Sequence, residues 1–237
     1  MKRLPFVSVI VPTLNEEKYI EFTLKALKAQ DYKGKYEIIV ADGNSKDNTV
    51  KIAKKYVDKV IVVKKKGVSA GKNAGAREAE GEILVFIDAD TVATFNLLTE
   101  IVKKFEEGVV GVTCPIMPLS AKITEFLLFW MYGQFVKISL KTKTPQVTGV
   151  CVAYERKAFE KIGGFNENIR FCEDFDISER ISKLGKIVCT DSAFVMTFPR
   201  RIRKWGKIKS IIKYVKFYLM YKLAGKMPKI NEYAPIR

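Results

Sequence analysis

The sequence predicts an α/β fold in which a mostly parallel sheet is flanked by helices and followed by an amphipathic helical extension at the C-terminus. Apolar, β-branched runs alternate with stretches of helical periodicity through the first half of the chain. The runs are almost continuously apolar, which is typical of strands that are covered on both faces. With 237 residues, of which 48% are hydrophobic, the chain can bury one substantial core.

Five strands are expected in this half. They cover residues 6–11, 36–42, 59–63, 82–87 and 109–114. The first apolar run is short and no small-residue cleavage site follows it, so we interpret it as a strand and not as a secretion signal. In sheets of this kind, ligands bind beyond the carboxyl ends of the strands.

Helices are expected between these strands. In residues 16–30, Ile20, Leu24 and Leu27 recur three or four positions apart, and Asn15 is the expected N-cap. The other helices expected in this half cover residues 45–56, 69–81 and 95–108. Strand and helix therefore alternate without a linker between them.

The charge balance is strongly basic. Lys and Arg outnumber Asp and Glu by 42 to 26, which gives a formal net charge of +16. Such a surplus favours an anionic partner: nucleic acid, an anionic lipid surface or a phosphorylated small molecule. A solvated, lysine-rich surface is the simpler alternative. Because the aromatic residues lie inside apolar periodic stretches and no recognition motif occurs, we expect no nucleic-acid partner.

Cysteine and histidine usage indicates the compartment. The chain has no histidine, and its four cysteines form no C-x-x-C pair, so we expect no zinc site. Scattered single cysteines are typical of the reducing cytoplasm. No run reaches the ~18 apolar residues of a membrane span. The expected location is therefore cytoplasmic. The cysteines are Cys114, Cys151, Cys172 and Cys189.

Two carboxylates follow the fourth expected strand, in "EILVFIDAD" (82–90). Residues two apart on a strand point to the same face, so Asp88 and Asp90 can emerge together at the ligand edge. Close carboxylates repel, and a cation between them relieves the repulsion. Oxygen ligands suit Mg²⁺ or Mn²⁺. The alternative is that both acids merely cap the following turn.

The neighbouring strand ends are polar as well. "PTLNEE" (12–17) follows the first strand and "ADGNSKDNT" (41–49) ends the second. Together with "GKNAGAREAEGEILVFIDAD" (71–90), these stretches closely resemble the family 2 glycosyltransferases. The resemblance extends from residue 5 to about 192 and implies the GT-A fold, a Rossmann-like fold that binds nucleotide sugars.

The resemblance also implies how the chain is divided. One continuous glycosyltransferase domain is expected over residues 1–200, with a nucleotide-binding half (1–115) and an acceptor-binding half (116–200). A basic amphipathic helical tail is expected over residues 201–237. The expected donor is a UDP- or GDP-sugar.

Carried over by position, the resemblance puts the donor at the strand ends. Asp42 is expected to accept a hydrogen bond from the base, and Lys72 to lie near the diphosphate. Asp90 is the expected direct ligand of Mn²⁺ or Mg²⁺, with Asp88 nearer the ribose or a metal-bound water. The residues expected against the nucleoside are Pro12, Thr13, Glu16 and Asp42.

The acceptor side lies in residues 147–187, which resemble the family's segment from a glycine-containing strand through "GGF" to an acidic pair. In this comparison Asp174 aligns with the catalytic base. A hydroxyl that attacks an anomeric carbon must lose its proton, and a chain without histidine offers a carboxylate for this. Direct displacement with inversion is then expected. Without the resemblance, "EDFD" (173–176) is better interpreted as an acidic helix start that the helix dipole stabilises. Further expected acceptor or phosphate contacts are Gly149, Gly164, Glu173, Arg200 and Arg201.

Two features depart from the family pattern. Many relatives have a histidine just before "FPRRIRKW" (198–205), and this chain has none, which puts the protein coordination of the metal in doubt. The "QxxRW" signature of processive synthases is also absent, which favours transfer of a single sugar.

Two helical segments lie outside the ordinary nucleotide-sugar fold. Residues 123–138 are aromatic and apolar, and residues 207–226 place lysines mainly opposite an apolar face. A basic amphipathic helix of this kind is typical of a peripheral membrane anchor. The alternative is that both helices pack on the domain or across a homo-oligomer interface. With membrane association, the acceptor would be lipid-linked, such as a polyprenyl or dolichyl phosphate.

Two alternatives to sugar transfer remain for a chain of this kind. A nucleotidyltransferase uses metal-bound carboxylates at the same sheet edge, but "PTLNEE" has no Gly- and Arg-rich phosphate loop. A catalytically silent nucleotide-sugar-binding protein is the second alternative. The presence of both Asp90 and Asp174 argues against it.

Overall fold

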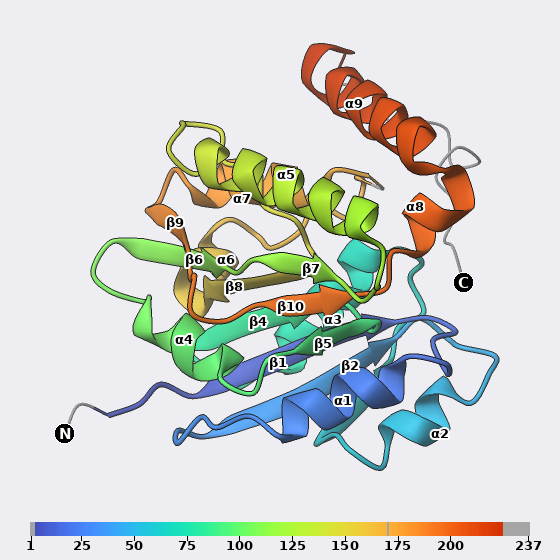
Figure 1. Cartoon of the computed structure of the whole chain (residues 1–237). Helices are drawn as coiled ribbons and strands as arrows, with labels where there is room; N and C mark the ends of the chain where they lie inside the picture. Colours follow the sequence, from blue (N-terminus) through green and yellow to red (C-terminus); the bar gives the residue numbers. More distant parts are fainter. Residues whose placement is uncertain (1–2, 170, 225–237) are drawn as a thin grey trace.

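A seven-stranded sheet forms the centre of the molecule in the computed structural model, which describes residues 3–169 and 171–224 (Figure 1). The strand order is β3-β2-β1-β4-β8-β6-β9. The strands are β1 (Val7–Thr13), β2 (Tyr36–Asp42), β3 (Lys59–Val62), β4 (Ile83–Ile87), β6 (Val109–Thr113), β8 (Cys151–Glu155) and β9 (Lys186–Cys189). All five strands expected from the first half of the sequence are present.

The sheet is mostly parallel, as predicted. β1 pairs in parallel with β2 and β4, β2 with β3, and β6 with β9. β8 is inserted antiparallel between β4 and β6. The carboxyl ends of β1, β2 and β4 therefore meet at one edge of the sheet, and β8 brings the second half of the chain beside them.

Helices cover both faces of the sheet. On one face, α1 (Ile20–Lys28), α2 (Thr49–Ala53) and α4 (Leu97–Lys103) pack on alternate residues of β1 and β4. On the other, α3 (Val68–Glu78), α6 (Arg156–Lys161) and α7 (Glu173–Ile181) pack on the intervening residues. Because successive side chains of a strand point to opposite faces of the sheet, the core is divided into two layers, one on each face.

The expected cap of α1 is wrong. The helix begins after Tyr19, and no side chain caps it. Asn15 instead adopts a φ of 53° and accepts a hydrogen bond on Oδ1 from the backbone N–H of Lys46 at 2.7 Å. It ties the loop after β1 to the loop after β2, because a short amide tolerates the left-handed conformation that this turn requires.

A second, three-stranded sheet was not predicted. It consists of β5 (Thr91–Ala93), β10 (Val195–Thr197) and β7 (Ile116–Pro118), in the order β5-β10-β7. β10 is antiparallel to β5, with Thr197 opposite Thr91. Since Thr91 directly follows Asp90, this pairing brings the segment after Thr197 close to Asp88 and Asp90, which form a D-x-D motif.

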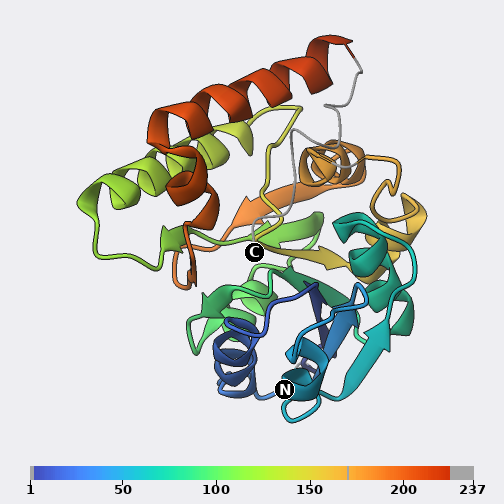
Figure 2. The ribbon, with the colours of Figure 1, turned by 90° about the vertical axis from the view of Figure 1, so that its right-hand side faces the viewer.

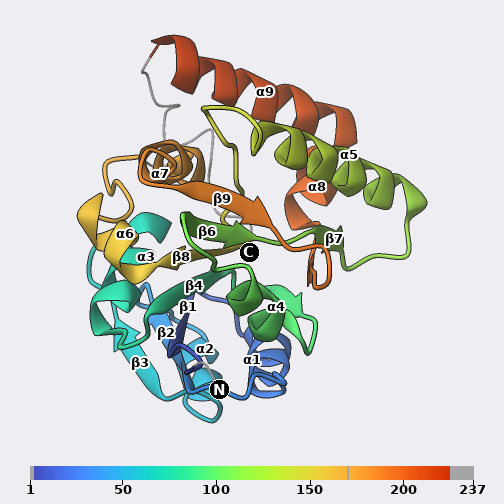
Figure 3. The same cartoon turned by 90° about the vertical axis from the view of Figure 1, so that its left-hand side faces the viewer.

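Three helices lie on the side of the molecule opposite α1 and α2. They are α5 (Ile123–Ser139), α8 (Arg200–Trp205) and α9 (Lys207–Ala224). Figures 2 and 3 show α9 beside α5. Gly206, with a φ of 84°, separates α8 from α9. Residues 225–237 of the predicted tail lie outside the described residues.

One face of α9 is packed and the other is exposed. Phe217 of α9 is buried against Phe171, which lies in the loop that precedes α7. The centroids of the two rings are 4.7 Å apart. The exposed large apolar residues of this helix are Ile208, Ile211, Ile212, Tyr214, Val215 and Leu219. Packing on the domain, one of the alternatives left by the sequence, therefore holds for one face of α9, while the other face is exposed.

Candidate active site

Asp88 and Asp90 follow β4 at the carboxyl edge of the sheet, as the sequence predicts. Asp90 is buried and Asp88 is partly buried. Burial raises the pKa of Asp88 to about 7; the Lys72 ammonium opposes this rise, and the Asp90 carboxylate adds to it. The two carboxylates therefore lie close enough to repel each other in a poorly solvated place.

Arg200 joins Asp90 to Glu16. Its Nε and Nη2 donate to Asp90 Oδ2 at 2.9 and 2.5 Å, and its Nη1 and Nη2 donate to Glu16 at 3.0 and 3.1 Å. The guanidinium also lies over the ring of Tyr19, 4.8 Å from the centroid. β10 brings Arg200 here. The contact with Asp90 was not predicted, because the two residues are 110 positions apart.

Lys72 links the sheet edge at Asp88 to Asp174 in the second half of the chain. It is 1% exposed on α3, and its Nζ donates to Asp174 Oδ1 at 2.7 Å. Burial lowers the pKa of Lys72, but the carboxylates of Asp174, Glu173 and Asp88 outweigh burial and raise it above its usual value. Lys72 is therefore a buried cation among three acids.

Two glycines allow this arrangement. A Cβ on Gly149 would overlap the carboxylate of Asp174, so only glycine leaves room for that side chain. Gly164 has a φ of 69°, which favours glycine, and a Cβ there would lie 2.7 Å from Asn73 Oδ1. Gly163, with a φ of 75°, and Gly164 together form a tight turn at "GGF".

Asn73 is a residue that the sequence analysis missed. Its amide donates to the backbone oxygen of Phe165 at 2.8 Å and accepts from the N–H of the same residue at 2.9 Å. It thereby clamps the "GGF" turn onto α3, one residue after Lys72. Its place in "GKNAG" was visible in the sequence, but a partner 92 positions away was not.

Glu173 and Arg201 lie near the same carboxylates. Burial raises the pKa of Glu173 to about 7, with a further rise from Asp174; the Lys72 charge lowers it. The positive charge of Arg201 lowers the pKa of both Asp88 and Glu173. Arg201 is thus placed to act on anions at this edge, consistent with its expected role toward phosphate.

The expected nucleoside contacts lie at the ends of β1 and β2. The hydroxyl of Thr13 is buried and has no hydrogen-bond partner among the described residues. Asp42 accepts from Ser45 N and Oγ at 2.8 and 2.5 Å, which fixes its carboxylate. Pro12 faces Gly71 at the start of α3. An unpaired buried hydroxyl beside a fixed carboxylate is a pattern that a bound base or ribose would satisfy.

The donor set fits a divalent cation that also binds phosphate. Asp88 and Asp90 provide hard oxygen ligands, and Mg²⁺ or Mn²⁺ typically takes one or two carboxylates together with substrate phosphates. Within residues 3–169 and 171–224, no group of three or more His, Cys, Asp or Glu side chains could hold a metal. Asp88 and Asp90 alone would leave most coordination positions of such a cation to water or to another ligand.

All four cysteines are free thiols. None of the helices within the described part of the chain combines the length and apolar composition needed to cross a bilayer.

A mostly parallel sheet that ends in paired carboxylates, beside a second half that contributes an acid, is typical of α/β enzymes that act on nucleotide-linked substrates. The family model for glycosyl transferase family 2 matches residues 8–163. The chain belongs to this family, and its fold is GT-A.

Relatives and solved structures agree with this assignment. The probable glycosyltransferase YdaM of Bacillus subtilis is 31% identical over 78% of this chain and 48% of its own length. A beta-monoglucosyldiacylglycerol synthase of Nostoc is 30% identical over 75% and 41%. A mannosyltransferase of Pyrobaculum calidifontis, solved with GDP-Man and Mn²⁺, has a TM-score of 0.69 at 23% identity, over 96% of this chain and 67% of that one. The chain spans about half the length of these curated relatives.

Proposed function

We propose that the chain transfers a single sugar from a nucleoside-diphosphate sugar to an acceptor hydroxyl or phosphate, with inversion at the anomeric carbon. The observation that carries the proposal is the pairing of Lys72 with Asp174 at 2.7 Å. The charge of Asp88 also raises the pKa of Lys72, so the Lys72 side chain lies near both Asp174 and Asp88. We place the reacting sugar between Asp174 and the carboxylates of Asp88 and Asp90.

In this proposal Asp174 is the general base. It accepts the proton of the acceptor hydroxyl while that oxygen bonds to the anomeric carbon. The bond between the sugar and the diphosphate breaks, and its electron pair leaves with the nucleoside diphosphate. Lys72 and the space beside Gly149 fix the position of the Asp174 carboxylate. Attack from the side opposite the leaving group gives inversion.

The leaving group needs positive charge. Asp88 and Asp90 would hold Mn²⁺ or Mg²⁺, which would stabilise the negative charge that the diphosphate gains as the bond breaks. Arg200 and Arg201 are the cationic side chains at this edge that can contact the diphosphate. The structural neighbour that was solved with GDP-Man and Mn²⁺ supports the pairing of metal and nucleotide.

Two variants test the division of labour. Asp174→Asn should leave donor binding nearly intact and abolish transfer. Asp90→Asn should abolish the effect of Mn²⁺ on donor binding. The measurements are thermal shifts with UDP- and GDP-sugars, each with and without Mn²⁺, and release of the nucleoside diphosphate. Donor binding without turnover in the wild type, with every acceptor tried, would favour a silent nucleotide-sugar-binding protein.

We further propose that the protein works at a membrane surface, on the cytoplasmic side, with a lipid-linked acceptor. Eight large apolar side chains of α5 and six of α9 are exposed. The two helices lie on the same side of the molecule (Figure 3). One relative bears the name of a monoglucosyldiacylglycerol synthase, whose product is a lipid. The exposed apolar residues of α5 are Ile123, Phe126, Leu127, Trp130, Met131, Tyr132, Phe135 and Ile138.

A further inference from the structure

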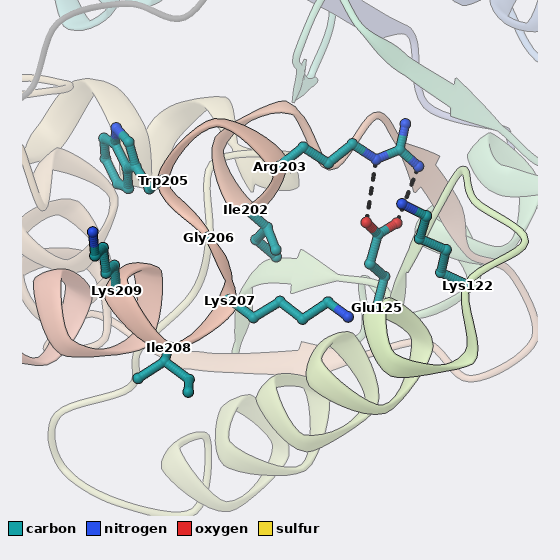
Figure 4. A pocket seen from close by; sticks show the side chains of 9 residues that line it. All are labelled: Lys122, Glu125, Ile202, Arg203, Trp205, Gly206, Lys207, Ile208 and Lys209. Atoms are coloured by element: carbon teal, nitrogen blue, oxygen red, sulfur yellow. Dashed lines mark hydrogen bonds and ion pairs between the residues drawn. The ribbon is translucent and has the colours of Figure 1, made fainter.

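A basic pocket lies where α8 turns into α9, beside the N-terminal end of α5 (Figure 4). Its volume is about 730 Å³. We call it the basic pocket; its cationic residues are Lys122, Arg203, Lys207 and Lys209. It lies apart from Asp88, Asp90 and Asp174, and the proposed sugar transfer makes no use of it.

The charges in the basic pocket do not cancel. Glu125 is the acid among its described lining residues, and it is buried. Arg203 donates to its two oxygens at 3.2 and 3.1 Å and thereby neutralises it. The ammonium of Lys207 donates to the hydroxyl of Thr124, which is uncharged. Three lysine charges are therefore left over, and they favour an anion.

Apolar side chains border the basic pocket on both sides. Ile123, next to Lys122 on α5, is 75% exposed, and Ile208, between Lys207 and Lys209 on α9, is 74% exposed. Trp205 and Ile202 line the pocket itself. A ligand that matches this surface has an anionic head and apolar chains.

Other occupants match the surface less well. A free nucleotide or phosphate would use the cations but leave both apolar faces in water. A second copy of this chain, paired symmetrically, would bring like charges together, because the net charge is +16. An anionic bilayer satisfies the charges and the apolar faces together.

We propose that the basic pocket binds the phosphate headgroup of an anionic phospholipid while the exposed faces of α5 and α9 enter the bilayer surface. This inference rests on the proposed membrane association, to which it assigns a headgroup site, and it is independent of sugar transfer. Lys122 and Lys209 are the residues to change, since neither contacts Asp174 or the D-x-D motif.

The test compares two double variants with the same change in net charge. Lys122→Glu with Lys209→Glu alters the pocket. Lys51→Glu with Lys54→Glu is the control, because both lysines are exposed, Lys51 on α2 and Lys54 directly after it, and α2 lies at the opposite end of the molecule (Figure 1). Each protein is sedimented with vesicles of phosphatidylcholine alone and of phosphatidylcholine with phosphatidylglycerol. Thermal unfolding with inorganic phosphate and with a short-chain phosphatidylglycerol completes the comparison.

We expect the wild type to bind the anionic vesicles and the pocket variant to bind them about tenfold or more weakly. The control should lose much less. Equal losses in both variants would mean that net charge alone drives binding and would overturn the pocket. Wild type that binds neither vesicle would overturn membrane association as well. If inorganic phosphate raised the unfolding temperature as much as short-chain phosphatidylglycerol does, the site would be assigned to free phosphate instead of lipid.

Discussion

Arg200 Nη2 lies 2.5 Å from Asp90 Oδ2, so an arginine engages the carboxylate that the D-x-D motif would offer to a metal. The same guanidinium binds Glu16 through two hydrogen bonds. A metal ion and a guanidinium that contact the same carboxylate oxygen repel each other, so each binds the carboxylate more weakly than it would alone. Arg200 and a divalent ion should therefore compete for Asp90 when no nucleotide is bound.

The first prediction concerns this competition. Arg200→Gln should raise the affinity of the nucleotide-free protein for Mn²⁺ by about tenfold, because one charge-assisted contact with Asp90 no longer has to be broken. The measurement is the free Mn²⁺ signal in electron paramagnetic resonance. Arg203→Gln is the matched control, since Arg203 pairs with Glu125 and not with the D-x-D motif. An affinity unchanged by Arg200→Gln would show that Arg200 and the metal do not compete.

The second prediction concerns Lys72. Lys72→Met should lower the free energy of unfolding by about 3 kcal/mol, because it removes a buried cation from among three acids. Urea unfolding followed by circular dichroism measures the change. Lys72→Arg keeps the charge and should recover part of the loss. Unfolding of Lys72→Met at the urea concentration of the wild type would mean that solvent already screens these acids.

The sequence was sufficient for the local structure and for the position of Asp88 and Asp90 at the carboxyl edge of the sheet. Apolar runs and helical spacing predicted the strands and helices from β1 to β6 other than β5, because each depends on residues near one another in the chain. Asp88 and Asp90 lie where the end of β4 puts them. The acids at 173–176 begin α7, which confirms the helix-start interpretation, whereas the role of Asp174 stays a proposal.

The contacts that complete the site depend on distant pairings. β5 and β10 have three residues each, too few for a periodic signal, yet their pairing brings Arg200 to Asp90. The hydrogen bonds between Asn73 and Phe165 likewise join residues that are far apart in the sequence. Asn15 shows the converse, because a residue that looks like a helix cap is used by a tertiary contact instead.

The third prediction uses Gly149. Gly149→Ala should abolish transfer and leave donor binding within about twofold of wild type, because the added Cβ would displace the carboxylate of Asp174 without touching the strand ends. Nucleotide release and donor thermal shifts measure the two effects. Gly133→Ala on α5 is the control, since an added Cβ there meets nothing within 4 Å. Full transfer by Gly149→Ala would contradict the role of the Asp174 position.

The last prediction concerns pH. Burial, and then the charge of Asp174, raise the pKa of Glu173 from 4.5 to about 7 in the folded protein. Between these values the folded protein holds a proton that the unfolded chain has released. The free energy of unfolding should therefore fall as pH rises from about 5 to about 7, and the loss is complete above the folded pKa. Asp88, whose pKa is also raised to about 7, gives a slope of the same sign.

Glu173→Gln should remove the share of the slope that belongs to Glu173 and make the variant more stable than the wild type near pH 8, with the advantage shrinking toward about pH 5. Urea unfolding across this range measures the difference. Glu107→Gln, at an exposed carboxylate between α4 and β6, is the control and should leave the slope unchanged. A difference between Glu173→Gln and wild type that stays constant from about pH 5 to about pH 8 would rule out a proton held at Glu173, because linkage requires the difference to change with pH wherever the two states bind different numbers of protons.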